Sequence, residues 1–282
     1  MPTIDVQGAD LSDAAIGRGE TIVALHSSAC SGAQWRGLAE TIGGQYRLCA
    51  PDLIGYGSSD AWQAPGRLSL ADEARRVEVL LDACEGPVHL VGHSYGGAVA
   101  LKLARAHGKR LASLTLIEPV AFHLLCCRDP LSALSYGQVR TLADDVAEAL
   151  RLDKAETAMR RFVEYWNGLG AWDALSQRQR DALLRVAPKV PHDFWATMTE
   201  PASVRDYAQI TTPTLLIAGG SSPQPTRRIF ELLATAISAS QGVVLRGAGH
   251  MVPLTDPSRV NRVIVRHIAA HGLKKTGLPM VA

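Results

Sequence analysis

The pentapeptide at residues 92–96 reads Gly-His-Ser-Tyr-Gly and has the pattern Gly-x-Ser-x-Gly. A short apolar run at 88–91 precedes it, and a run of small residues at 97–104 follows it. This context predicts a strand, a sharp turn and a helix, with the Ser94 hydroxyl exposed on the turn. Glycines flank the turn because a Cβ there would collide with the adjacent strand or helix. A serine so placed is suited to nucleophilic attack on a carbonyl carbon.

A serine hydroxyl attacks only if a base removes its proton and a third group orients that base. His250 directly follows the last apolar strand candidate, within Gly-Ala-Gly-His-Met-Val-Pro, so we expect it on a loop and assign it the role of base. The developing oxyanion needs hydrogen-bond donors. We assign these to the backbone N–H groups of Tyr95, at the helix N-terminus, and Ser28, on the loop after the first core strand candidate.

The elements that must position these residues alternate between apolar β-branched runs and helical patterns. This alternation predicts a mostly parallel sheet with helices on both faces. The predicted strands are 21–25, 46–51, 88–91, 111–118, 213–218 and 243–245. The predicted helices include 72–84, a segment from 226, and 258–271.

The strand rhythm is interrupted from about 120 to 208, where the patterns are helical and aromatic residues gather. We therefore predict a core domain of residues 1–119 and 209–282, with a helical cap at 120–208 inserted between strands. Clefts form where two such parts meet, so some cap aromatics should face a pocket. Trp166, Trp172 and Trp195 are the candidates, and they predict a substrate with an apolar acyl or alcohol group.

Composition narrows the function classes further. The chain has 282 residues, of which 47% are hydrophobic, and a net charge of +2, which favours neither nucleic acid nor an anionic membrane as partner. No stretch is long and apolar enough to span a bilayer, and no signal peptide is recognisable. The five cysteines are read as free thiols, so a cytoplasmic location is expected. None has zinc-ligand spacing, and no metal is expected.

Four motifs together resemble those of the α/β-hydrolase fold superfamily, and specifically its cap-bearing serine hydrolases. They are His-Ser-Ser at 26–28, Pro-Asp-Leu-Ile-Gly-Tyr-Gly-Ser-Ser at 51–59, Gly-His-Ser-Tyr-Gly-Gly at 92–97 and Gly-His at 249–250. The resemblance covers nearly the whole chain. It implies a mostly parallel sheet of about eight strands flanked by helices, with the cap after the sixth strand. It also implies a Ser–acid–His triad and no cofactor.

The chain departs from the family pattern at the acid of the triad. Most members carry an Asp in a Gly-x-x-Asp pattern after the cap, whereas this chain has Ser222 at that position. Glu118 ends the strand after the nucleophile's strand–helix unit, at the sheet edge where sites form. Haloalkane dehalogenases resemble this arrangement, so Glu118 is our candidate acid. The remaining alternatives are Asp206, Glu200 and Asp256.

The sequence thus predicts a serine hydrolase that cleaves a carboxylic ester of a small molecule through an acyl-enzyme on Ser94, with His250 as base and Glu118 as acid. A C–C bond hydrolase or a thioesterase would use the same triad. A non-catalytic small-molecule binding protein on the same scaffold also stays open, because the usual acid position is vacant. The sequence does not predict an oligomeric state.

Overall fold

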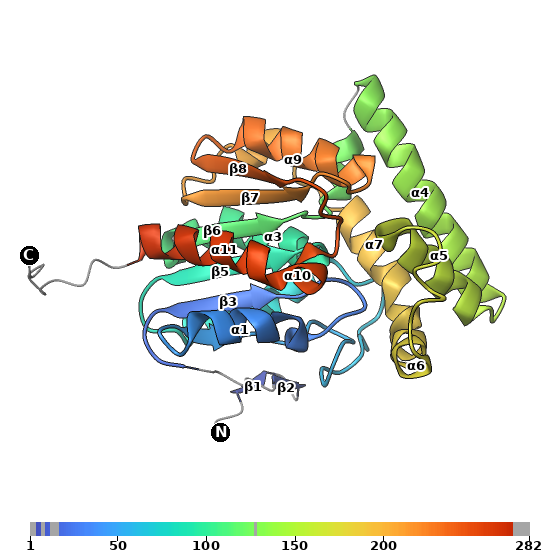
Figure 1. The fold of residues 1–282 in the computed structure, drawn as a ribbon, viewed down its shortest axis with the longest axis horizontal. Helices are drawn as coiled ribbons and strands as arrows, with labels where there is room; N and C mark the ends of the chain where they lie inside the picture. Colours follow the sequence, from blue (N-terminus) through green and yellow to red (C-terminus); the bar gives the residue numbers. More distant parts are fainter. Residues whose placement is uncertain (1–3, 7–8, 12–16, 127–128, 273–282) are drawn as a thin grey trace, which may run out of the picture.

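A parallel sheet of six strands organises the computed structural model, which describes residues 4–6, 9–11, 17–126 and 129–272 (Figure 1). The strand order is β4-β3-β5-β6-β7-β8, and every neighbouring pair is parallel. The strands are β3 (Thr21–Leu25), β4 (Arg47–Cys49), β5 (Val88–His93), β6 (Leu111–Ile117), β7 (Thr214–Gly219) and β8 (Ser240–Leu245).

Helices cover both faces of this sheet because its strands are apolar on both sides. Along β3, Ile22 and Ala24 pack with α1 (Arg36–Ile42) and α11 (Pro257–His271), whereas Val23 and Leu25 point into the opposite core. That opposite face is covered by α2 (Leu70–Asp82), α3 (Tyr95–His107) and α9 (Gln224–Ala236). Short elements complete the layers: η1 (Gly32–Trp35), η2 (Gly108–Arg110) and α10 (Val252–Thr255).

The sheet has six strands in the described residues, where the family resemblance had implied about eight. The two remaining strands, β1 (Ile4–Val6) and β2 (Ala9–Leu11), form a separate antiparallel pair. Each has three residues, and each pairs with the other, so they do not extend the main sheet at β4. The apolar strand patterns of the sequence had located the six main strands and no others.

The segment at 120–208, here called the helical insert, connects β6 to β7. Its elements are η3 (Phe122–Cys126), α4 (Pro130–Arg151), α5 (Ala155–Asn167), α6 (Gln177–Val186), η4 (Ala187–Lys189), α7 (Val190–Met198) and α8 (Val204–Tyr207). Figure 1 shows α4 to α7 grouped beside the end of the sheet toward which the strand arrows point. The insert therefore lies next to the carboxyl ends of the parallel strands. No described helix combines the length and apolar character needed to cross a membrane.

Candidate active site

Ser94 occupies the turn between β5 and α3, and its backbone is strained there. Its φ of 54° and ψ of −115° lie outside the regions that residues with a Cβ prefer. A Cβ at Gly96 would lie 2.4 Å from the carbonyl oxygen of Leu25, and one at Gly92 would lie 2.5 Å from that of Gly96. The two glycines thus allow strand, turn and helix to approach closely enough to hold the serine in this conformation.

A buried chain of hydrogen bonds runs from this serine through a histidine to a carboxylate. The Ser94 Oγ lies 2.9 Å from His250 Nε2, and the His250 Nδ1 lies 2.7 Å from Glu118 Oε2. Ser94 is 5% exposed, His250 is 1% exposed and Glu118 is fully buried. The imidazole therefore stands between a hydroxyl and a carboxylate with one ring nitrogen toward each.

Parallel pairing brings these three residues together from distant parts of the chain. Ser94 follows β5 and Glu118 follows β6, and these strands are neighbours in the sheet. His250 lies on the loop between β8 and α10. The Nε2 of His93 lies 2.9 Å from the carbonyl oxygen of His250, so His93 donates a hydrogen bond that holds this loop. Burial lowers the pKa of His93 to about 3, which keeps that ring neutral.

The Glu118 carboxylate is held in its charged form and in one orientation. Burial alone would raise its pKa, but hydrogen bonding and charge interaction with His250 outweigh burial, and the pKa lies below its ordinary value. The backbone N–H of Gly219, at the end of β7, donates to Oε1. Oε2 is thereby left to face the imidazole. Ser222, which stands where the family usually has Asp, is buried on the loop that follows Gly219.

Two backbone amides assigned as oxyanion donors lie beside Ser94. Tyr95 is the first residue of α3, so its N–H has no carbonyl partner within the helix and stands at the positive end of the helix dipole. Ser28 and Tyr95 both border the same small cavity as Ser94. These two residues thus flank the space next to the serine hydroxyl.

The loop that carries Ser28 is braced by side chains. The Oε1 of Gln34 accepts hydrogen bonds from the N–H and the hydroxyl of Ser27, at 3.1 and 3.0 Å. The Nε2 of His26 accepts a hydrogen bond of 2.9 Å from the N–H of Leu53. Burial lowers the pKa of His26 to about 4, consistent with a neutral ring that can accept at this nitrogen.

A buried ion cluster connects the helical insert to the core behind this loop. Lys189, only 7% exposed, lies 3.1 Å from Glu73 Oε1 of α2 and forms a second ion pair with Asp193 of α7. Burial alone would lower the pKa of Lys189, but these two carboxylates raise it above its ordinary value. The ammonium is therefore charged and shared between the insert and the core.

The same carboxylates reach the residues around the serine. Asp193 Oδ2 accepts from the Ser28 hydroxyl at 2.6 Å and from the Tyr56 hydroxyl at 2.5 Å. Glu73 Oε1 accepts from the Tyr95 hydroxyl at 3.1 Å. Sequence reasoning missed this cluster. The available signal was a lysine and an aspartate four residues apart, at 189 and 193, in an otherwise apolar helical stretch.

Two cavities of unequal size meet at Ser94. The large cavity has a volume of about 550 Å³, includes His250, and is otherwise mostly apolar, with Val163, Trp166 and Leu183 in its walls. The small cavity has a volume of about 20 Å³. Its walls include Ser28, Ser94, Tyr95, Val120, Phe122, Phe162, Trp166, Asp193 and Phe194.

The three tryptophans proposed for the pocket have different positions. Trp166 borders both cavities, and its ring stacks on His250 with centroids 4.2 Å apart. Trp172 is fully buried inside the insert, where its Nε1 donates to Glu156. Trp195 is 40% exposed and lies under the guanidinium of Arg67, 4.1 Å from the ring centroid.

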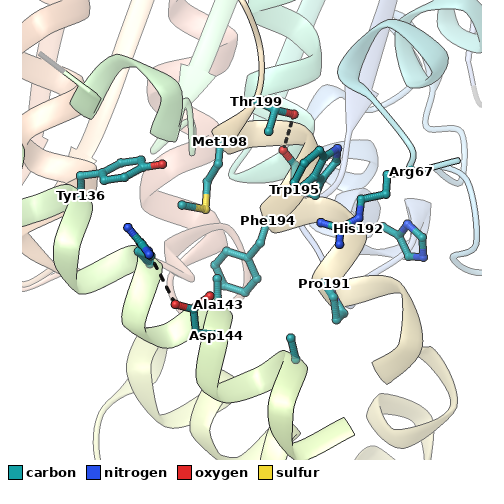
Figure 2. Close-up of a pocket in the computed structure, with 12 residues that line it drawn as sticks. Arg67, Tyr136, Ala143, Asp144, Pro191, His192, Phe194, Trp195, Met198 and Thr199 are labelled. Carbon is teal, nitrogen blue, oxygen red and sulfur yellow. Dashed lines mark hydrogen bonds and ion pairs between the residues drawn. The ribbon is translucent and has the colours of Figure 1, made fainter. Parts of the chain in front are cut away.

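The expectation for Trp172 and Trp195 therefore needs correction, because neither borders a cavity at Ser94. The Trp172 side chain is fully buried between the helices of the insert, so no part of its ring is exposed. Trp195 lines a separate outer cavity of about 440 Å³ between α4 and α7 (Figure 2). The rival acids also lie elsewhere: Glu200 pairs with Lys102, and Asp206 and Asp256 accept hydrogen bonds from backbone N–H groups at the starts of α8 and α11.

Within the described ranges, no cluster of three or more His, Cys, Asp or Glu side chains could hold a metal ion. The groups at Ser94 are a hydroxyl, an imidazole and a carboxylate joined in one hydrogen-bonded chain. Such a set is suited to acyl transfer without further groups.

The chain belongs to the alpha/beta hydrolase family, whose model matches residues 22–263. It is 28% identical over 259 residues to Lipase LipV of Mycobacterium tuberculosis, covering 86% of this chain and 91% of that protein. It is 27% identical over 254 residues to the pimeloyl-[acyl-carrier protein] methyl ester esterase of Aeromonas salmonicida, with 88% and 95% covered. These relatives are hydrolases, which supports a hydrolase enzyme of this family.

A solved structure agrees with the fold. The chain superimposes with a TM-score of 0.80 on an alpha/beta hydrolase enzyme from a Medee basin deep-sea metagenome library. The two share 16% sequence identity, and the match covers 98% of this chain and all of that one. At this identity the likeness concerns the fold alone.

Proposed function

We propose that this hydrolase cleaves carboxylic esters through an acyl-enzyme on Ser94, with His250 as base and Glu118 as the orienting acid. The observation that carries the proposal is the buried hydrogen-bond chain from Ser94 Oγ through His250 to Glu118 Oε2, at 2.9 and 2.7 Å. These separations lie within the range that proton transfer to a base requires.

In the acylation step, the Ser94 oxygen attacks the ester carbonyl carbon while His250 Nε2 takes the serine proton. The N–H groups of Ser28 and Tyr95 donate to the carbonyl oxygen as it becomes an oxyanion. His250 is then an imidazolium, and the Glu118 carboxylate at Nδ1 stabilises that charge. Collapse of the tetrahedral intermediate breaks the bond to the alkoxide, which receives the proton from Nε2.

In the deacylation step, a water molecule takes the place of the departed alcohol. His250 removes one of its protons, and the resulting hydroxide attacks the acyl carbon of the Ser94 ester. The second tetrahedral intermediate breaks its bond to the serine oxygen, which regains a proton from Nε2. The products are a carboxylic acid and the free enzyme, and the cycle uses no metal or organic cofactor.

The proposal includes a role for the helical insert as a cap of about residues 120–208 over a core of residues 1–119 and 209–282. Its support is that Phe162, Trp166 and Phe194 of the insert contribute walls to the cavities at Ser94. Because these walls are mostly apolar, the substrate is a small molecule with an apolar acyl or alcohol group. We keep the cytoplasm as the expected location.

The test combines a serine-directed fluorophosphonate probe with ester turnover. Ser94→Ala should abolish labelling and lower turnover by about a million-fold, because a triad nucleophile has been removed. Ser238→Ala is the matched control, since that serine is exposed and precedes β8, at the opposite end of that strand from the loop that carries His250. More than about a hundredth of wild-type turnover in a folded Ser94→Ala enzyme would contradict the assignment of the nucleophile.

A further inference from the structure

The two cavities at Ser94 differ in volume and also in which catalytic groups they contain. Ser94 and Ser28 border both. His250 borders only the large cavity of about 550 Å³, whereas Tyr95, with its amide at the helix start, borders only the small cavity of about 20 Å³. The serine oxygen therefore lies between a cavity that contains the imidazole and a cavity that does not.

This asymmetry fixes which half of an ester lies on which side. During acylation, His250 Nε2 must deliver the serine proton to the oxygen of the leaving alcohol, so that oxygen must lie on the side of His250. The alcohol then extends into the large cavity. The acyl chain leaves the carbonyl carbon along a different bond from the alcohol, and we assign it to the small cavity, which His250 does not border.

The volumes set the size of each half. A space of about 20 Å³ holds about one water molecule, or a methyl group in its place. A cavity of about 550 Å³ lies in the usual range for sites that hold an organic molecule. Its walls are largely apolar, with Val163, Leu175 and Leu183 among them, so a bulky apolar alcohol fits there.

Phe194 forms the part of the small cavity's wall that also borders the outer cavity. Its ring stacks on Phe122, with centroids 6.0 Å apart and planes at 15°, and meets Phe162 edge-on at 6.2 Å. On its other side Phe194 borders the outer cavity of about 440 Å³, and it lines both spaces. Figure 2 shows this ring extending from α7 into the space between Ala143 of α4 and Pro191.

We propose that the enzyme is selective for esters of acetyl-sized acids with bulky apolar alcohols, and that Phe194 determines the limit on acyl length. The proposal rests on the proposed function, because it takes Ser94 as the nucleophile and His250 as the base. The reaction forms an acyl–Oγ bond, breaks the carbonyl–alkoxide bond and moves the serine proton to the alkoxide. Water later takes the place of the alcohol, so no other reactant is needed.

The test uses two substrate series on the wild-type enzyme. With a 2-naphthyl alcohol held constant, kcat/KM should fall at least about 100-fold from acetyl to hexanoyl, because one surplus methylene in a tight pocket already costs about 10- to 200-fold. With acetyl held constant, kcat/KM should rise at least about tenfold from phenyl to 2-naphthyl, two leaving groups of similar acidity that differ in size. Better turnover of phenyl hexanoate than of 2-naphthyl acetate would reverse the assignment of the two cavities and overturn the proposal.

Variants then test the wall itself. Phe194→Ala should connect the small cavity to the outer one and raise the hexanoyl-to-acetyl ratio of kcat/KM at least about tenfold. Phe194→Leu serves if the alanine variant does not fold, with the same direction and a smaller rise. Phe230→Leu is the matched control, because that ring lies on α9 and lines none of the three cavities. An unchanged ratio in folded Phe194 variants rejects the role of Phe194.

Mass spectrometry of the trapped enzyme separates this proposal from the one on which it rests. If no ester of either series acylates Ser94, both proposals fail. If Ser94 becomes acylated but the rate is insensitive to acyl length, the ester hydrolase stands and the selectivity proposal is wrong.

Discussion

The Glu118→Gln variant tests the acid of the triad while almost preserving its shape. In the structure, Gly219 N–H donates to Oε1 and His250 Nδ1 lies 2.7 Å from Oε2. A glutamine amide has one oxygen that accepts and one nitrogen that donates. The buried N–H of Gly219 requires an acceptor, so the amide oxygen should face Gly219 and the amide nitrogen should face His250.

That orientation reverses the roles of the imidazole nitrogens. Nδ1 would have to accept a hydrogen bond from the amide, so the ring proton would move to Nε2, beside Ser94. Nε2 could then no longer accept the serine proton, and no carboxylate would stabilise an imidazolium. Loss of the orienting carboxylate with retained geometry lowers kcat by about 10⁴ in serine proteases. We expect a loss of three to four orders of magnitude, equivalent to about 4–5 kcal/mol in the activation free energy.

The assay is the initial rate of hydrolysis of a chromogenic acetate ester by purified protein whose far-UV circular dichroism and Tm show that it is folded. Glu231→Gln is the matched control, since that glutamate is exposed and pairs with Arg228 on α9. Its rate should stay within twofold of wild type. A Glu118→Gln rate within about tenfold of wild type would refute the tautomer argument and place the acid elsewhere.

A second change can distinguish lost charge from lost folding. A Cβ built on Gly219 would lie 2.6 Å from the Ser222 hydroxyl, so the Ser222 side chain is directed toward the strand end that contacts Glu118. Adding Ser222→Asp to Glu118→Gln should therefore restore part of the activity, whereas Ser222→Ala alone should cost little. No restoration would indicate that a carboxylate at 222 does not reach Nδ1.

Two further predictions concern stability. Lys189→Met leaves two buried carboxylates, Glu73 and Asp193, without their counter-ion, and should lower the free energy of unfolding by about 3–5 kcal/mol in urea titrations. Adding Glu73→Gln and Asp193→Asn to this variant should recover much of the lost stability. A Lys189→Met protein as stable as wild type would contradict a stabilising role for these two ion pairs. The pKa values of His26 and His93 are lowered to about 4 and about 3 by burial, from 6.5, so in the window below pH 6.5 the unfolded chain binds protons that the folded chain does not. Stability should therefore fall with falling pH, by about 2 kcal/mol for each histidine between pH 6.5 and 5, and a Tm that holds or rises over that interval would be inconsistent with two buried neutral rings.

Much of the fold was predictable because the signals for it are local. Each main strand has three to seven residues and contains an apolar run or pair, and the flanking helices have apolar faces, so short windows of sequence reveal both. The main sheet has six strands in the described residues, two fewer than the family resemblance implied. The short strands Ile4–Val6 and Ala9–Leu11 are three residues each and pair with one another instead of joining that sheet.

The positions of Ser94 and Glu118 were predictable because they follow from the sheet topology. Neighbouring parallel strands have their carboxyl ends at the same edge of the sheet, so these two residues had to lie close together once their strands were recognised. The acid could be sought there because Ser222 cannot carry a charge.

Side-chain directions in the insert could not be predicted in the same way. Trp166, Trp172 and Trp195 are alike in sequence terms, yet one borders the cavities, one is buried and one stacks under an arginine. Helix periodicity shows which face is apolar, but not whether that face meets a cavity or another helix. The ion cluster of Lys189 was hidden for a related reason, because its partner Glu73 is 116 residues away along the chain.

The helical insert and the sheet share a single hydrophobic core on the α3 side. One continuous set of buried side chains runs from Leu90 and Leu116 of the sheet to Val139, Phe162 and Val190 of the insert. Exchange of the whole segment with that of another family member would therefore cut through the core as well as the pocket wall. Chimaeras made at the boundaries of residues 120 and 208 should be poorly soluble, and redesign of selectivity in this chain is better pursued by single substitutions at the cavity walls.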